Sequence, residues 1–255
     1  MDMFFDKKIP EHLRTSFGPK AGKIDGLQEA GFRIPKTFFA LLPSGQQEGT
    51  KALSETIVFH GKKEQISSLI IRSSQINEDG HTFSMAGQGL SIPNLPLDAN
   101  TIENALRKLV ETSETRSVAL IIQEYIHTES LYVSFSVNPN YDSPFSMLCE
   151  RYEVNNGTLT IGKLISHESA KVDDPLSRKL DWVDLAMSLQ LHYGYPVDVE
   201  WVYLKQKPMI LQVRPITRIM YPVKSLWTNA NFRAVYYTHL RAHETRHDIV
   251  CRLLL

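Results

Sequence analysis

The sequence predicts an α+β fold, because amphipathic helical patterns alternate with strand patterns that include a clear hairpin. Residues 196–217 read as two strands joined by a tight turn, and residues 118–126 form a nearly continuous apolar run that is typical of a central strand. Helical periodicity covers residues 100–111 and 181–193. With 255 residues, 42% of them apolar, the chain can form one large domain or two small ones.

Composition and charge exclude several classes of partner. Lys plus Arg and Asp plus Glu number 28 each, so no net charge favours nucleic acid or an anionic membrane, and we expect neither partner. No apolar run approaches the roughly 20 residues of a membrane-spanning helix, and residues 1–10 lack the apolar segment of a signal peptide. Two cysteines, Cys149 and Cys251, are too few for a disulfide framework, which favours a cytoplasmic location.

The N-terminal part of the chain alternates helices and strands. A helical pattern follows the segment GPKAG at residues 18–22 and ends at Gly31, ahead of a strand at residues 37–42. A second apolar strand at residues 69–71 leads into Arg72, Ser73 and Ser74. Residues 84–89 (SMAGQG) are small enough to bring backbone N–H groups close to an anion.

Two helices complete the predicted scaffold. Asn100 is the expected N-cap of the first, with Glu103 three residues later as in a capping box. Gly194 is the expected end of the second. The apolar faces are expected at Ile102, Ala105, Leu106, Leu109 and Val110 in the first helix, and at Trp182, Leu185, Ala186, Leu189 and Tyr193 in the second.

Three further strands are expected between the two helices. Residues 131–139 alternate between apolar and polar side chains, which is typical of a half-buried strand. Residues 147–152 and 158–165 read as two strands of a hairpin, joined by the turn signal NNG at residues 155–157.

The C-terminal hairpin is the strongest candidate for a site. If Gln206 is the centre of its turn, Glu200 faces Gln212 and Asp198 faces Arg214. Because side chains alternate across a strand, these four groups share one face. The opposite face is expected to be apolar and buried, and it comprises Val197, Val199, Trp201, Tyr203, Met209, Leu211 and Val213.

The polar face of this hairpin allows two interpretations. Glu200 and the Gln212 carbonyl could supply oxygen ligands to Mg²⁺, whose remaining ligands would include substrate phosphates, while Arg214 could bind a phosphate through two hydrogen bonds. The alternative is a salt-bridged pair on a solvated sheet face. Spacing alone favours the alternative, because surface ion pairs are common and weak.

Several motifs resemble one family. "DVEW" followed by "LQVRPIT" resembles the end of the ATP-binding domain of the phosphoenolpyruvate synthase and pyruvate phosphate dikinase family. "IRSSQINEDGHTFSMAGQ" is similar to a second signature of that family, "GPKAG", "EAGFRIP" and "KTFFAL" are similar to its beginning, and "FSVNP" matches in part. The family's Gly-Leu-Gly-Glu segment is absent, and the connection at residues 43–66 is shorter than usual.

The resemblance implies an ATP-grasp-like fold in two lobes, at residues 1–95 and 96–222, with Mg-ATP between them. Arg72 and Arg214 would be the catalytic residues that neutralise phosphate charge. Glu200 and Gln212 would bind Mg²⁺. The remaining ATP contacts would be made by Lys20 at the phosphates, Gly87 in the glycine-containing loop, the backbone of Gln123, Glu124 and Ile126 at adenine, and Asp198 in support.

The implied activity is transfer of phosphate from ATP to a histidine on another domain or partner protein. Residues 166–170 (SHESA) lack the pattern of the family's phosphohistidine domain, so we expect no phosphorylatable histidine in this chain. The principal alternative is a non-catalytic nucleotide-binding sensor or partner-binding module, which the shortened connections favour. A third alternative is an ATP-grasp ligase that forms acyl phosphates.

Residues 235–255 differ in character from the rest. They resemble the translated read-through of a sequencing-library adapter, which marks them as a probable non-native tail and implies that the natural protein continues beyond Ala234. A basic helix is the structural alternative. A metal site at His239, His243 and His247, which are spaced by one helical turn, is the other.

Overall fold

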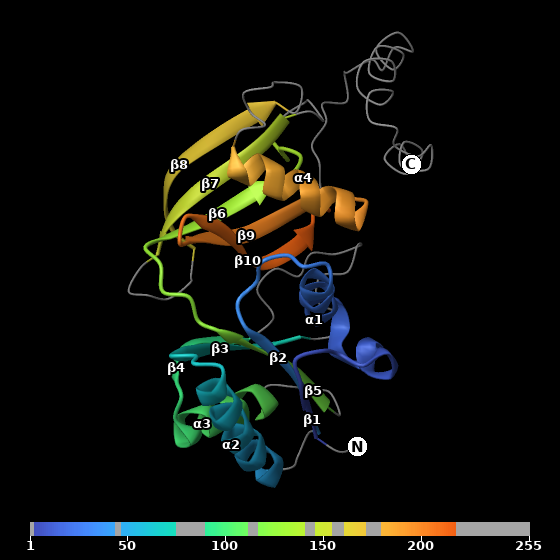
Figure 1. Cartoon of the computed structure of the whole chain (residues 1–255), viewed down its shortest axis with the longest axis vertical. Helices are drawn as coiled ribbons and strands as arrows, with labels where there is room; N and C mark the ends of the chain where they lie inside the picture. Colours follow the sequence, from blue (N-terminus) through green and yellow to red (C-terminus); the bar gives the residue numbers. More distant parts are fainter. Residues whose placement is uncertain are drawn as a thin grey trace.

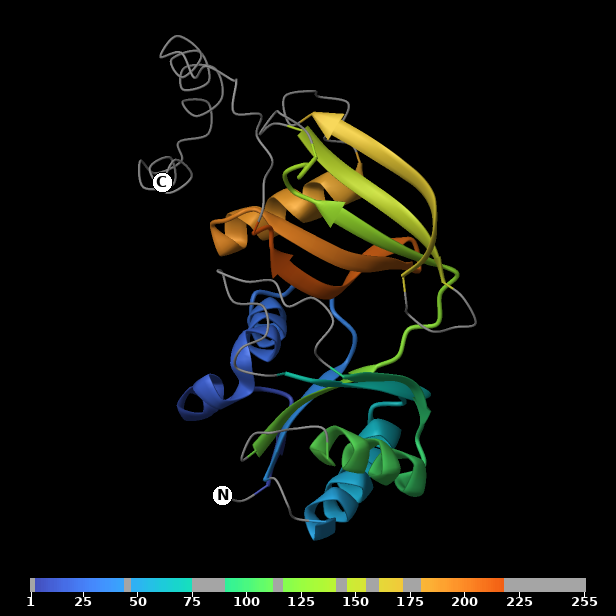
Figure 2. The same cartoon turned by 180° about the vertical axis from the view of Figure 1, so that it is seen from behind.

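The chain folds into two lobes, each built on an antiparallel sheet of five strands (Figure 1). The computed structural model describes residues 3–43, 47–74, 90–111, 117–140, 146–154, 161–171 and 180–217. Helices pack against each sheet, and one helix lies where the lobes meet, as both views of the cartoon show (Figures 1 and 2). The chain therefore has the two-lobed α+β fold that the sequence predicts.

The first lobe has β5 at its centre, as the apolar run predicted. Its strands are β1 (Phe4–Asp6), β2 (Thr37–Pro43), β5 (Ser117–Glu124), β3 (Ser68–Ser73) and β4 (Ser91–Pro96), in that spatial order. Its helices α2 (Gln47–Lys63) and α3 (Ala99–Glu111) pack on one another and bury a shared core against the sheet. The expected lobe boundary at residues 95–96 is wrong, because α3 and β5 follow it but belong to this lobe.

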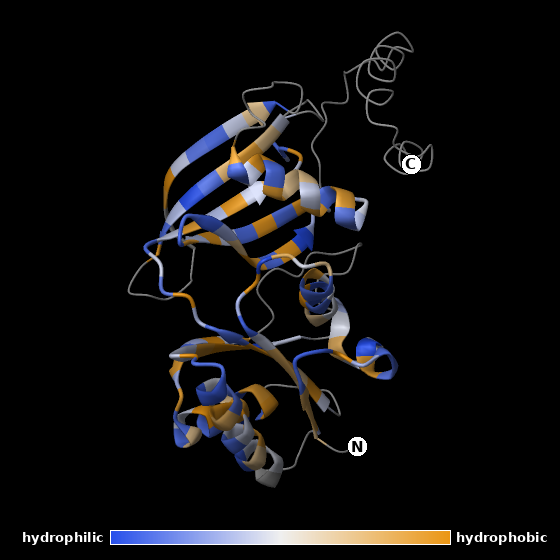
Figure 3. Cartoon of the chain, viewed as in Figure 1, coloured by the Kyte–Doolittle hydropathy of each residue, from blue (hydrophilic) through white to orange (hydrophobic). Residues whose placement is uncertain are grey.

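The sheet of the second lobe consists of a meander whose first strand pairs with a C-terminal hairpin. Its strands are β10 (Lys207–Pro215), β9 (Val197–Leu204), β6 (Ser130–Phe135), β7 (Ser146–Val154) and β8 (Ile161–Lys171), in that spatial order. Helix α4 (Asp181–Tyr193) covers one face and ends at Gly194, whose φ of 74° is the left-handed conformation that glycine adopts without strain. Figure 3 shows apolar and polar residues alternating along these strands, so each face has its own character.

The core beneath α4 is anchored by Trp201, which is among the largest fully buried side chains in the described part of the chain. Its indole Nε1 donates a hydrogen bond to Ser134 Oγ over 2.8 Å, and its ring stacks on Tyr132. A buried indole N–H usually has a hydrogen-bond partner, because leaving it unpaired costs free energy. Ser134 therefore fixes the face of β9 that turns toward α4.

Helix α1 (Arg14–Glu29) lies where the two lobes meet and follows a short 3₁₀ turn, η1 (Glu11–Leu13). It is broken at Gly18, where φ is 70° and ψ is 172°. Pro19 follows, which suits the first position of a helix because its missing N–H would have no helical partner there. The segment GPKAG thus starts a new helical segment, as the sequence predicted.

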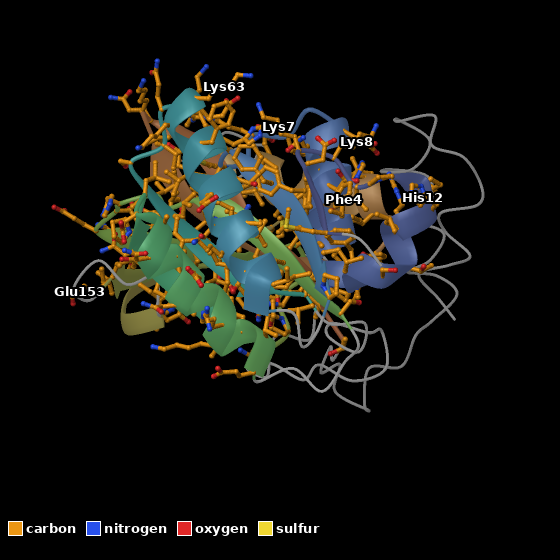
Figure 4. All side chains as sticks on the ribbon, turned by 90° about the horizontal axis from the view of Figure 1, so that it is seen from below. Phe4, Lys7, Lys8, His12, Lys63 and Glu153 are labelled. Atoms are coloured by element: carbon orange, nitrogen blue, oxygen red, sulfur yellow. The ribbon has the colours of Figure 1, made fainter. Side chains whose placement is uncertain are left out.

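Ion pairs lie on the outer surface of the first lobe. Figure 4 shows Lys7, Lys8 and Lys63 at that surface. Lys7 Nζ lies 2.6 Å from a carboxylate oxygen of Glu64, and Lys8 Nζ lies 2.6 Å from one of Glu29. Exposed pairs of this kind contribute little to stability, so the lobe depends on its apolar core.

The N-cap of α3 is Asp98 rather than the expected Asn100. Asp98 Oδ2 accepts hydrogen bonds from the Thr101 N–H at 2.8 Å and from its hydroxyl at 2.7 Å, which lowers the pKa of the Asp98 carboxyl. The predicted apolar stripe is confirmed, since Ile102, Ala105, Leu106 and Leu109 are buried and Val110 is partly buried. The helix therefore begins two residues earlier than the sequence pattern suggested.

Substitution of this cap tests the assignment. Asp98→Ala should lower the midpoint of thermal unfolding, because it removes the acceptor of two hydrogen bonds at the helix N-terminus. Since the folded-state pKa of Asp98 is lowered, the effect should be full above the ordinary aspartate pKa and disappear as the pH falls through the lowered value. Asn100→Ala should leave the midpoint unchanged, and a larger loss for Asn100→Ala than for Asp98→Ala would contradict the assignment.

Candidate functional site

The C-terminal hairpin has the two polar pairs that the sequence predicted, although its turn is not centred on Gln206. Glu200 is opposite Gln212, and Asp198 is opposite Arg214. Lys205 and Gln206 form the turn with φ values of 52° and 61°, the conformation that tight two-residue hairpin turns require. The four polar groups therefore lie on one face of the second sheet, which is called the site face below.

The apolar side of the hairpin differs from expectation because β10 contains a bulge. The register shifts between Ile210 and Gln212, which leaves Leu211 as an extra residue. As a result, Ile210 joins the core beneath α4, whereas Met209 and Leu211 pack with Val202 in a separate cluster. The assignment of Met209 and Leu211 to the α4 side was therefore wrong.

Arg72 connects the two lobes at the site face. It lies on β3 of the first lobe, is 6% exposed, and donates from Nη1 to Gln212 Oε1 over 3.1 Å. Its Nε is buried and has no hydrogen-bond partner among the described residues. Burial lowers the pKa of Arg72, Glu200 raises it, and Arg214 lowers it further, so all three groups interact.

A second arginine lies beside this contact. Arg214 Nη2 donates a hydrogen bond to Glu200 Oε1, and both side chains are mostly buried. Two guanidinium groups, Arg72 and Arg214, thus interact with the same carboxylate. Because both guanidinium groups are poorly solvated, an anion that bound here could pair with donors that the protein leaves underused.

The two N-terminal motifs also meet near this point. Ser74, just beyond the end of β3, accepts a hydrogen bond from the Ala21 N–H at 3.1 Å and donates to the Phe17 carbonyl at 2.5 Å. Lys20, which is 8% exposed, lies between these two contacts in the sequence. The structure thus places Lys20 at the start of a helical segment beside the end of the strand that contains Arg72.

Part of the segment that was expected to contact adenine, Gln123 to Ile126, already makes hydrogen bonds within the first lobe. The Glu124 N–H donates to the Lys36 carbonyl over 2.8 Å, and the Gln123 side chain donates to Thr37 Oγ1 over 3.0 Å. Both donors are therefore used inside the first lobe, which disagrees with an adenine contact through the Glu124 N–H. Ile126, in contrast, lies at the second lobe, because its buried side chain packs with apolar residues on the site face.

An apolar cluster that the sequence analysis did not identify lies on the site face. The core of this cluster consists of Ile126, Leu131, Val202, Met209 and Leu211. Asp198, Glu200 and Val202 are two residues apart along β9 and so share a face, which means that the position of Val202 could have been predicted from the sequence. The position of Leu211 could not, because a bulge has no simple sequence signal.

Some predicted features cannot be compared with the structure. Gly87 and the rest of the segment 75–89 lie outside the described residues, as does the tail at residues 235–255. The segment 166–170 is part of β8. None of the helices in the described ranges is both long and apolar enough to cross a membrane.

Comparisons with known proteins add a distant relative. No protein-family model matches the chain. Among curated proteins, it is similar to the probable phosphoenolpyruvate synthase of Methanocaldococcus jannaschii, with 26% identity over 206 residues, covering 60% of this chain and 17% of that protein. The chain thus spans about a sixth of the length of this relative.

Solved structures with low sequence identity also resemble the chain. D-alanyl-alanine synthetase A from Vibrio cholerae has a TM-score of 0.47 at 11% identity, covering 84% of this chain and 58% of that one. The RimK domain protein ATP-grasp from Sphaerobacter thermophilus has a TM-score of 0.44 at 14% identity, covering 86% of this chain and 64% of that one.

The contact between the lobes can be tested by stability. Gln212→Leu should lower the free energy of unfolding by about 1–3 kcal/mol, because it leaves the buried Arg72 guanidinium without the amide that accepts its hydrogen bond. Urea denaturation measures this loss. Gln28→Leu is the matched control, since the Gln28 amide makes an exposed hydrogen bond to the Lys7 carbonyl. Equal stability of the two variants would contradict the assigned role of Gln212.

Proposed function

We propose that this chain is the ATP-binding part of a phosphotransferase that transfers phosphate from Mg-ATP to a histidine on another domain or partner protein. The observation that supports this most strongly is the Arg72 guanidinium, which is buried between the lobes with Nε unpaired in the described part of the chain. A buried cation with an unused donor is costly unless an anion completes its hydrogen bonds.

The site face divides into halves that match the two ends of a nucleotide. The polar half contains Glu200, Gln212 and Arg214, and Arg72 approaches it from the first lobe. The apolar half is the cluster around Val202. Ligand sites commonly combine apolar walls with a few placed polar groups, so adenine would pack on the apolar half and the phosphates would lie along the polar half.

The polar half also suits Mg²⁺. Glu200 and Gln212 offer a carboxylate and an amide oxygen at paired positions of β9 and β10. Mg²⁺ commonly takes one or two protein oxygens and completes its shell with phosphate oxygens and water, so this donor set fits. A bound Mg²⁺ would neutralise charge on the phosphates. In the present structure these oxygens accept hydrogen bonds from Arg214 and Arg72, which would turn to the phosphates when the metal binds.

Phosphoryl transfer depends mainly on positioning and charge neutralisation. Arg72 and Arg214 would bind phosphate oxygens through their paired N–H groups. Lys20 would add a third positive charge from the start of the helical segment that follows Gly18, where backbone N–H groups also favour an anion. Asp198, opposite Arg214, would orient that guanidinium.

The likeness to a probable phosphoenolpyruvate synthase supports the choice of a phosphotransferase. Because residues 166–170 lack the pattern of the family's phosphohistidine domain, the acceptor histidine is assigned to a different domain or chain. The buried free thiol of Cys149, whose pKa burial raises to about 11, fits the cytoplasmic location that we propose.

A nucleotide-binding sensor is the second candidate, and the absence of the family's Gly-Leu-Gly-Glu segment together with the short connection at residues 43–66 favours it. A sensor would bind the nucleotide at the same residues and transfer nothing. In either case adenine would not contact the Glu124 N–H, which is paired with the Lys36 carbonyl.

Substitution of the ion pair tests the binding site. The double variant Glu200→Ala, Arg214→Ala should weaken Mg-ATP binding by at least about tenfold, because it removes a metal ligand and a charge-assisted phosphate contact. Isothermal titration calorimetry measures the affinity. Glu103→Ala, Arg107→Ala is the matched control, since it removes an ion pair from the outer face of α3. Unchanged affinity in the first variant would refute the site.

Transfer is tested separately from binding. ATP labelled at the β- and γ-phosphates is incubated with the chain and a candidate histidine-containing domain, and the label on protein is measured. Label on histidine supports the phosphotransferase. Tight Mg-ATP binding without label on any histidine acceptor would instead support the sensor.

A further inference from the structure

A third carboxylate, besides those of Asp198 and Glu200, lies on the site face, two strands away from Glu200. Val133 on β6 is paired with Glu200 on β9 and with Glu150 on β7. Paired residues of neighbouring antiparallel strands point to the same face, so Glu150 lies on the site face too. Two strand spacings, roughly 10 Å, separate the backbone positions of Glu150 and Glu200.

Glu150 is oriented by its neighbour on the same strand. The Tyr152 hydroxyl donates a hydrogen bond to Glu150 Oε2 over 2.6 Å, and both side chains are partly buried. Burial and the nearby carboxylate raise the pKa of Tyr152 to about 12, so the hydroxyl remains a donor at neutral pH. Within the described residues, Tyr152 is the partner that the structure gives Glu150, which leaves Oε1 to accept another hydrogen bond.

A β-bulge in the neighbouring strand lies beside this pair. The register between β7 and β8 shifts beside Tyr152, where Ile165 of β8 is an extra residue between Leu164 and Ser166. Bulges commonly turn nearby side chains at functional positions. The bulge therefore lies directly next to the oriented pair.

A row of paired residues crosses the second sheet, with groups that favour phosphate at one end and the Glu150 carboxylate further along. It runs from Gln212 through Glu200, Val133 and Glu150 to His167 at the edge strand β8. At one end, Arg72 contacts Gln212, and the guanidinium groups favour phosphate. Glu150 lies beyond the apolar Val133, which is 8% exposed, and a carboxylate there would repel phosphate and attract an N–H donor.

We propose that Glu150, oriented by Tyr152, binds the N–H group of the imidazole that accepts the phosphoryl group. This inference rests on the proposed function. An imidazole has an N–H on one side of its ring and a nitrogen lone pair on the other. With the N–H bound to Glu150, the lone pair faces the polar half of the site face, where the phosphates would lie.

The transfer step replaces one bond to phosphorus with another. The N–P bond forms with the lone pair of the free ring nitrogen, and the P–O bond to the nucleotide breaks, with its electron pair leaving on the nucleotide. The N–H proton stays on the imidazole and remains hydrogen-bonded to Glu150. The ring gains positive charge during this step, and the carboxylate stabilises that charge.

The test uses imidazole and N-methylimidazole as probes, because N-methylimidazole keeps the lone pair but has no N–H group. Ligand-observed NMR titrations of the 255-residue chain give both affinities, with and without Mg-ATP. Glu150→Met should weaken imidazole binding by about tenfold, the loss of one charge-assisted hydrogen bond, and leave N-methylimidazole binding unchanged. Tyr152→Phe should weaken imidazole binding less, because the carboxylate remains but is no longer oriented.

Glu153→Met is the matched control, because Glu153 lies on the same strand but is paired with Ser130 and points to the opposite face. Figure 4 shows Glu153 at the outer edge of the molecule. This variant should bind both probes like the wild type. Circular dichroism confirms that each variant is folded.

Two results would overturn the inference: no saturable imidazole binding by the wild type, or equal loss of both probes in Glu150→Met. The same titrations separate this inference from the proposed function. If Mg-ATP fails to bind while imidazole binding depends on Glu150, the proposed function fails and the imidazole site stands. If Mg-ATP binds and imidazole does not, the imidazole site alone fails.

Discussion

The arrangement of this protein depends on one buried contact, the hydrogen bond from Arg72 of the first lobe to Gln212 of the second. A guanidinium group loses strong hydration when it is buried, and a single neutral acceptor replaces only part of it. Glu200 compensates some of this cost through its charge, whereas Arg214 adds to it. Arg72 therefore retains hydrogen-bonding capacity that an anion could use, which supports the phosphate site that we propose.

The position of that contact follows from the geometry of the second sheet. The two-residue turn at Lys205 and Gln206 pairs Met209 with Val202 and Ile210 with Trp201. The bulge at Leu211 then shifts the register by one residue, which places Gln212 opposite Glu200 and leaves Met209 and Leu211 on the same face as that pair. One short hairpin thus supplies both the polar half and part of the apolar half of the site face.

Much of this could be predicted from sequence because it is local. The helices depend on their apolar periodicity, so their buried faces were predicted correctly. The pairs Glu200–Gln212 and Asp198–Arg214 were also predicted, but the turn is formed by Lys205 and Gln206 instead of being centred on Gln206, and the bulge at Leu211 restores the predicted pairs. The lobe boundary was wrong because β5 inserts between β2 and β3, a pairing of distant segments that local patterns do not encode. The pairing of the Glu124 N–H with Lys36 and the bulge at Leu211 depend on tertiary contacts of the same kind. Glu150 and Tyr152 could have been found, since residues two apart on a strand share a face.

The central claim is that Arg72 Nε, which has no hydrogen-bond partner among the described residues, binds a phosphate oxygen of the nucleotide. A crystal structure of the chain with Mg²⁺ and a non-hydrolysable ATP analogue tests it most directly. The account predicts a phosphate oxygen within hydrogen-bond distance of Arg72 Nε and the metal beside Glu200. A nucleotide bound elsewhere, with Arg72 still contacting only Gln212, would contradict the account.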